Sequence, residues 1–130
     1  MIGGWVLDAD AVCGFASGGS VYTQALVWTA VEEGMVLVVP ATALARSAAT
    51  VGERDRPALT VLLDLPVTVV DNLVRQRANE VGQLLAAVGA DDLALGHAVR
   101  CARQRGWPLV TADKAAARRL DDRVDVRELP

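Results

Sequence analysis

The sequence predicts an α/β fold, in which a parallel sheet of about four to five strands lies between layers of helices. Short runs rich in valine and leucine recur along the chain between turn formers, which is typical of buried strands. Longer segments with helical periodicity separate these runs. Strands that alternate with helices form crossover units, and the strands of such units are parallel and covered on both faces.

The expected strands are short apolar runs that stop at a turn former or an acid. The first stops at Asp8, the second at Pro40 and the third at Asp71, and Asp113 follows the fourth. In chain order the expected strands are "WVL", "MVLVVP", "VTVVD", "PLVTADK" and "VDVREL". Four of these runs therefore place a proline or a carboxylate at or just beyond the end of a predicted buried strand.

The expected helices are bounded by residues that start or stop helices. Gly34 and Gly106 each follow a periodic segment at the position of a C-terminal cap, and Pro66 closes another segment. The segment "GADD" stops a long amphipathic helix and starts the next one. In chain order the expected helices cover residues 11–16, 21–33, 41–52, 56–66, 72–88, 91–105 and 115–120. Eight residues are expected in the core: Leu7, Val36, Val38, Val69, Leu84, Leu95, Val99 and Leu109.

Length and charge restrict the class of protein. A chain of 130 residues matches one domain with a single core, and 52% of its residues are apolar. The net charge of -3 and the pI near 5.0 argue against nucleic-acid binding over the whole surface. All but Lys114 of the 13 basic residues are arginine, and we favour solvated helix faces over a phosphate-binding strip for the group that gathers late in the chain. That group is Arg100, Arg103, Arg105, Arg118 and Arg119.

The cysteines and the apolar segments indicate a cytoplasmic protein. Cys13 and Cys101 lie inside apolar patterns without metal-type spacing, so we expect reduced core thiols and no disulfide. The longest apolar stretch, residues 35–45, is too short to span a bilayer and contains Pro40. No signal peptide and no membrane segment are predicted.

Aspartates that follow strands suggest a site. Asp8 and Asp113 each follow a strand expected to be central, and ligands of parallel sheets bind beyond the carboxyl ends of the strands. The alternative is helix capping, which we favour for Asp71 and leave open for Asp91 and Asp92. Carboxylates that converge in a crevice repel one another unless a cation neutralises them, and Mg²⁺ or Mn²⁺ suits oxygen ligands. Metal-assisted phosphoryl chemistry is the leading enzyme class.

Other residues that could carry chemistry give weaker signals. His97 lies among apolar neighbours on its helix and is expected to be a partly buried structural residue. No other histidine exists, which excludes a histidine-rich metal site. The segment "SGGS" lacks the lysine of a phosphate-binding loop. Phe15, Tyr22 and Trp28 are expected to pack over the sheet, with a partner-binding patch as the alternative.

The order of "VLDADAV", "VVPATALA", "DDLALGHAVRCARQRGWPLVTADK" and "VDVREL" resembles the PIN domain, the fold of many small bacterial ribonucleases including VapC-type toxins. The resemblance covers nearly the whole chain and is most specific at "RQRGWPLVTADK". It implies a single PIN-like domain over residues 1–130, with an acidic pocket that holds Mg²⁺ or Mn²⁺ for cleaving RNA. It also implies that Asp8 and Asp113 are metal ligands and that Thr111 is the hydroxyl residue preceding the second of them.

Two positions depart from the family pattern. The family usually has glutamate in the helix after the second strand, where this chain has Arg46. The usual aspartate of the later helix falls on Leu95, while Asp92 lies one turn earlier on the same helix face. We therefore expect Arg46 to reach into the crevice that holds Asp8 and to pair with one or two carboxylates as a built-in cation. Binding of Mg²⁺ is then expected to be weak or absent.

Three functional hypotheses follow. The first is a metal-dependent ribonuclease of toxin–antitoxin type, weakened or inactive, with Asp8, Asp92 and Asp113 as catalytic and metal-holding residues. The second is a non-catalytic PIN-like module that binds RNA or protein. The third is a haloacid-dehalogenase-type phosphatase, because "VLDADAV" also fits a D-x-D motif with Asp8 as nucleophile and Asp10 as acid. The partners to consider are RNA, an antitoxin-like protein and a second copy of the chain.

Overall fold

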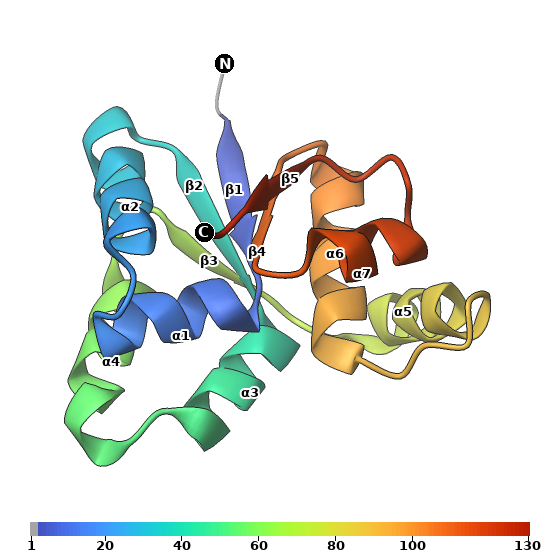
Figure 1. Ribbon diagram of the computed structural model, residues 1–130, viewed down its shortest axis with the longest axis horizontal. Coiled ribbons are helices and arrows are strands. Elements are labelled where there is room, and N and C mark those ends of the chain that lie inside the picture. The colour runs from blue at the N-terminus through green and yellow to red at the C-terminus, as the bar shows by residue number, and fades with distance from the viewer. Residues whose placement is uncertain (1–2) are drawn as a thin grey trace.

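The computed structural model, which describes residues 3–130, contains a five-stranded sheet in the order β3-β2-β1-β4-β5 with all neighbouring strands parallel (Figure 1). The central strand is β1 (Gly4–Leu7), flanked by β2 (Val36–Pro40) and β4 (Leu109–Thr111). The edges are β3 (Thr68–Asp71) and β5 (Val126–Glu128). The predicted α/β class with a parallel sheet is confirmed.

Seven α-helices and one short 3₁₀ helix connect the strands over the part of the chain described. Helices α1, α2 and α4 lie on one side of the sheet and α5, α6 and α7 on the other, while α3 contacts both α1 and α6 (Figure 1). The bounds are α1 (Ala9–Ser17), α2 (Val21–Glu33), α3 (Ala41–Thr50), η1 (Glu53–Asp55), α4 (Arg56–Asp64), α5 (Arg75–Ala86), α6 (Leu93–Arg105) and α7 (Lys114–Leu120). None of these helices is long and apolar enough to cross a membrane.

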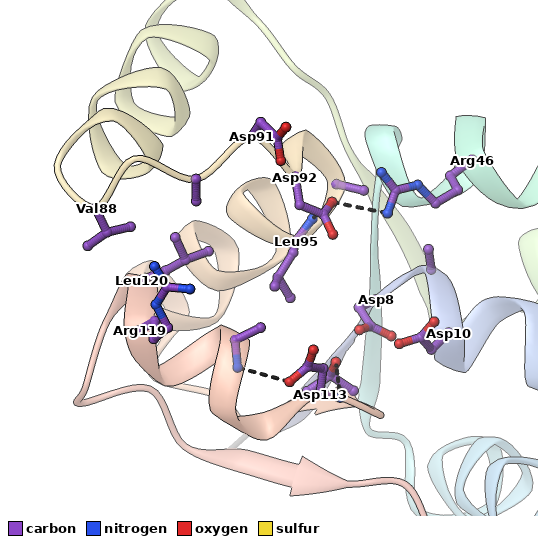
Figure 2. A pocket seen from close by; sticks show the side chains of 15 residues that line it. Asp8, Asp10, Arg46, Val88, Asp91, Asp92, Leu95, Asp113, Arg119 and Leu120 are labelled. Atoms are coloured by element: carbon purple, nitrogen blue, oxygen red, sulfur yellow. Dashed lines mark hydrogen bonds and ion pairs between the residues drawn. The ribbon is translucent and has the colours of Figure 1, made fainter.

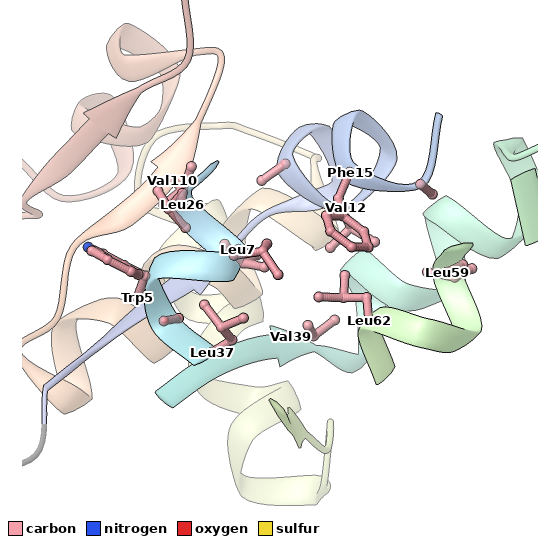
Figure 3. Packing of buried hydrophobic residues seen from close by; sticks show 14 residues of the cluster. Trp5, Leu7, Val12, Phe15, Leu26, Leu37, Val39, Leu59, Leu62 and Val110 are labelled. Carbon is pink, nitrogen blue, oxygen red and sulfur yellow. The ribbon is translucent and has the colours of Figure 1, made fainter. Parts of the chain in front are cut away.

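The central strand feeds two hydrophobic cores because its side chains alternate between the faces of the sheet. Trp5 and Leu7 point to the core beneath α1, α2 and α4, which also holds Val12 and Leu62 (Figure 3). Val6 points to the opposite core, beneath α5, α6 and α7. Burial on both faces explains why this strand is an uninterrupted apolar run and carries no polar alternation.

Helix α6 packs closely against its neighbours because small residues face them. A side chain on Gly96 would meet Leu85 of α5 at 3.1 Å, which is tighter than ordinary contact. Gly106 ends the helix with φ of 67°, and its N–H donates to the carbonyl of Ala102. Such a left-handed residue is the C-terminal cap that glycine adopts without strain. The absence of a side chain at Gly96 therefore lets α6 lie close against α5.

Several details differ from the sequence predictions. Helix α5 begins at Arg75 and not at residue 72, and α1 is longer than predicted because Asp8 caps it. Val69 was expected in the core, but its exposed fraction is 42% because β3 is an edge strand. Val36 and Leu84 are only partly buried, whereas the other predicted core residues are buried.

The early aromatic residues do not form one exposed patch. Phe15 is buried with 3% exposure, and its ring lies 6.4 Å from that of Trp28. Tyr22 and Trp28 keep exposed fractions of 38% and 43%. Packing therefore accounts for Phe15, while the α2 side chains are only partly covered.

Candidate functional site

A cavity of about 200 Å³ opens at the carboxyl ends of β1 and β4 (Figure 2). The two strands are adjacent and parallel, with Leu7 opposite Val110, so the residues that follow them emerge side by side. Asp8 and Asp113 both line this cavity. The lining is completed by Ala9, Asp10, Arg46, Val88, Ala90, Asp91, Asp92, Ala94, Leu95, Thr111, Ala116, Arg119 and Leu120.

Asp8 is a buried carboxylate with 4% exposure. Its Oδ1 accepts the N–H of Ala11 at 3.0 Å and so caps α1. The pKa of Asp8 is raised to about 6, because burial and, to a smaller extent, the nearby Asp10 carboxylate outweigh the hydrogen bonds from Thr111 and the helix backbone that lower it. Ionised Asp8 is therefore costly in the protein alone, and a cation placed beside it would remove much of that cost.

Asp113 and Thr111 share the other wall of the cavity. The Oδ1 atom of Asp113 accepts the N–H of Ala116 at 2.9 Å and caps α7. Thr111 is fully buried, and its hydroxyl accepts the backbone N–H of Asp113 at 3.2 Å. The same hydroxyl lowers the pKa of Asp8. Thr111 thus interacts with both acidic residues and holds the turn from β4 into α7.

Asp92 and Arg46 form an ion pair at the rim. The Nη1 atom of Arg46 lies 3.0 Å from Oδ1 of Asp92, and that oxygen also accepts the N–H of Leu95 to cap α6. The two side chains are half exposed, at 50% for Arg46 and 42% for Asp92. Figure 2 shows Leu95 between this pair and Asp113. The prediction that Arg46 pairs with a carboxylate of this cavity agrees with the Asp92 pair, and within residues 3–130 Arg46 forms no ion pair with Asp8.

The donor types of the cavity are those that a hard divalent cation takes, but among residues 3–130 Asp8, Asp92 and Asp113 do not bring three oxygens within 4.8 Å of one another. Asp8, Asp92 and Asp113 each use Oδ1 for a helix cap, which leaves the second oxygen of each carboxylate outside the cap. Asp10 is exposed in the first turn of α1 and adds negative charge at the mouth. Carboxylate and hydroxyl oxygens are the ligands of Mg²⁺ and Mn²⁺. The helix-capping interpretation and the metal-site interpretation are therefore compatible in this cavity.

A second polar cluster, which the sequence analysis missed, lies between β3 and α6. The predicted cap role of Asp71 is wrong, because α5 begins four residues later behind Val74 without a side-chain cap. Asp71 Oδ2 instead lies 2.8 Å from Nε2 of His97 and 3.1 Å from Sγ of Cys101. The available signal was the spacing of His97 and Cys101, which places them one turn apart on one helix face.

The cluster of Asp71, His97 and Cys101 is held in one protonation state by its surroundings. Burial tends to raise the pKa of Asp71, but hydrogen bonds from His97 and Cys101 and the Arg77 charge outweigh it, so the pKa is lowered. Burial lowers the pKa of His97 more than Asp71 raises it, which leaves a neutral imidazole. Burial raises the pKa of Cys101 to about 12, so it is a thiol. Both cysteines are free of disulfides, as predicted, but only Cys101 is a core thiol, because Cys13 is partly exposed.

Comparison with known proteins identifies the fold. No family model matches the chain, and no curated protein matches it. Among solved structures 14 chains match, including one from the crystal structure of VapBC2 from Rickettsia felis bound to a DNA fragment from their promoter. That chain aligns with a TM-score of 0.70 and 14% identity over 100% of both chains. At this identity the likeness concerns the fold, and it confirms the PIN-like fold expected from the sequence.

Proposed function

We propose that this protein is a PIN-like, metal-dependent ribonuclease of toxin–antitoxin type whose activity is weakened by Arg46. The observation that carries the proposal is the acidic cavity, where Asp8 and Asp113 follow adjacent parallel strands and line one space. A buried carboxylate with a raised pKa in a cleft is a typical feature of a functional site. The fold neighbour from a VapBC complex is consistent with this class.

Each residue of the cavity has a defined task in this proposal. Asp8 and Asp113 would hold Mg²⁺ or Mn²⁺, and Asp92 would contribute from the rim. Thr111 positions both acids through its hydroxyl. The bound ion would supply positive charge against the phosphodiester and lower the pKa of water there. Asp10 increases the negative potential that attracts the cation.

Arg46 explains why the proposed activity is weak. Its guanidinium neutralises Asp92, so a third acid is withdrawn from the ion, and its positive charge lies on the wall of the same cavity. A half-exposed arginine is partly screened by solvent, so it weakens metal binding without abolishing it. Asp8 and Asp113 remain free of arginine among the residues described.

The same ion pair favours a second candidate function, a non-catalytic module that binds RNA or a protein. In that case Arg46 and Arg119, which both line the cavity, would bind phosphate in place of a metal ion. An antitoxin-like protein is the partner that the fold neighbour suggests for either function. The phosphatase hypothesis receives no support from the fold comparison.

An RNA cleavage assay separates the two candidates. Labelled single-stranded RNA is incubated with Mn²⁺ and the unmodified protein, Asp8→Asn, Arg46→Glu or the surface control Asp122→Asn. We expect slow cleavage by the unmodified protein and by the control, faster cleavage by Arg46→Glu and none by Asp8→Asn. Binding of RNA without cleavage by any of the four proteins would favour the non-catalytic module.

A further inference from the structure

We propose that Asp71, His97 and Cys101 form a second metal site, which takes a transition-metal ion of the Zn²⁺ class. Their ligand atoms all lie within 4.8 Å of one another, with Asp71 Oδ2 at 2.8 Å from His97 Nε2 and 3.1 Å from Cys101 Sγ. Around a tetrahedral Zn²⁺ such atoms are separated by roughly 3.3 to 3.7 Å. A small outward movement of the side chains would therefore make room for the ion.

The donor set selects the kind of metal. Imidazole nitrogen, thiolate sulfur and carboxylate oxygen together suit Zn²⁺ and its transition-metal neighbours, whereas Mg²⁺ prefers oxygen alone. His97 and Cys101 project from the same face of α6, and Asp71 is the last residue of β3. His97 and Cys101 are fully buried, so two of the three ligands are fixed by packing before any metal arrives.

A hydrogen bond to a residue outside the proposed ligand set orients the ring of His97. The Nδ1 atom of His97 lies 2.9 Å from Oγ1 of Thr42 on α3. Metal-binding histidines normally donate their other ring N–H to such an acceptor, which fixes the orientation of the ring. When Nε2 binds the metal, the imidazole proton resides on Nδ1 and is donated to Thr42. Cys101 binds as thiolate, so its proton passes to the solvent.

The surrounding charges permit a divalent ion. Arg77 lies 3.3 Å from Asp71 Oδ2, and its repulsion would oppose a bare cation. A divalent ion with one carboxylate and one thiolate is neutral in sum, so Arg77 would face an uncharged set. Arg77 is also held by Glu80 at 3.2 Å and by Gln104. Arg77 therefore keeps Glu80 and Gln104 as partners when the metal binds Oδ2 of Asp71.

A hollow next to Asp71 provides access to the site. It has a volume of about 400 Å³ and is lined by Asp71, Arg77, Glu80 and Gln104, among others. Water in this hollow would supply the fourth ligand that three protein ligands leave open. None of Asp71, His97 and Cys101 lines the acidic cavity, so this site is independent of the proposed ribonuclease centre.

Titration of the metal-free protein with Co²⁺ in excess Mg²⁺ tests the proposal. The Mg²⁺ occupies oxygen sites, and Co²⁺ reports a thiolate ligand through its charge-transfer absorption. We expect this absorption to saturate at one equivalent in the unmodified protein and in Cys13→Ser, a matched control for the other cysteine. Cys101→Ser should lose the absorption and bind Zn²⁺ at least about 100-fold more weakly.

Two variants distinguish the loss of a metal ligand from the loss of the fold. Serine at position 101 retains a hydroxyl that can donate to Asp71, so Cys101→Ser should fold, which circular dichroism verifies. His97→Gln should bind Co²⁺ more weakly while retaining the thiolate absorption at high metal concentration. Absence of the absorption in folded unmodified protein, or its persistence in Cys101→Ser, would overturn the proposal and leave the cluster as a hydrogen-bonded core network.

Discussion

The guanidinium of Arg46 and the carboxylate of Asp92 form an ion pair of 3.0 Å that links α3 to α6 at the rim of the acidic cavity. Asp92 also caps α6 with the same oxygen atom. Arg46 therefore neutralises Asp92, the carboxylate that the N-terminal cap of α6 contributes to the cavity. The pair divides the acids of the cavity into a free group, around Asp8 and Asp113, and a neutralised one.

Replacing Arg46 by glutamate should strengthen metal binding. At a separation of about 5 Å and an effective dielectric near 20, one unit interaction is worth roughly 3 kcal/mol, and screening of a half-exposed side chain reduces this. We expect Mn²⁺ to bind Arg46→Glu at least about 10-fold more tightly in calorimetric titration. Arg54→Glu, which makes the same charge change at an exposed arginine, should leave the affinity nearly unchanged. Tight binding by the unmodified protein that Arg46→Glu does not alter would show that Arg46 has no influence on the site.

Asp8→Asn should stabilise the metal-free protein at neutral pH. The folded pKa of about 6 exceeds the ordinary value of 3.8. The ionised carboxylate therefore destabilises the fold in full above the folded pKa, and this effect disappears below the ordinary pKa, where the carboxyl group is protonated in both states. Asparagine keeps the helix cap and removes the charge. Urea unfolding in chelator should show a gain of about 2 kcal/mol at pH 8 that fades towards pH 4. Asp10→Asn, at an exposed neighbouring acid, should show a much smaller gain, and equal gains for both variants would contradict the burial argument.

Asp71→Ala should destabilise the protein strongly. The substitution leaves His97 Nε2 and the Cys101 thiol without their acceptor, and unpaired buried donors cost about 1 to 3 kcal/mol each. The pKa of Asp71 is lowered in the fold. The stability that its charge contributes is therefore present above the ordinary carboxylate pKa and is lost as the pH falls through the lower pKa of the folded protein. We expect a loss of about 2 to 4 kcal/mol at pH 7 by denaturant unfolding. A surface replacement, Asp122→Ala, is the control, and equal small effects for the two variants would show that the cluster is not needed for stability.

Leu109→Ala should remove core packing beneath α6 and α7. Leu109 is fully buried in the central part of the sheet, and truncation of such a leucine costs about 2 to 5 kcal/mol. Val69→Ala, on the exposed edge strand, should cost below about 1 kcal/mol. Thermal unfolding of both variants measures the difference. Similar losses at the two positions would contradict the burial found here.

The chain's local pattern was enough to place its helices and strands and to predict one part of the site. Apolar runs and glycine stops are short-range signals, and the adjacency of Asp8 and Asp113 follows from parallel strands that end at the same edge of a sheet. Helix boundaries were less well predicted, as the start of α5 shows, because Asn72 and its neighbours can be helical or extended without changing the periodicity.

Only the tertiary structure decided which partners the remaining polar residues meet. By sequence alone Asp71 looks like a helix cap, but the packing of α6 against β3 presents His97 and Cys101 to it, and buried donors take the nearest acceptor. Val69 looks like core, but strand order puts β3 at an edge where one side lacks cover. Arg46 could reach several acids by sequence, and the distance between α3 and α6 selects Asp92. Each outcome depends on elements that are far apart in the chain, and the free energy of burial and pairing is settled only when those elements pack together.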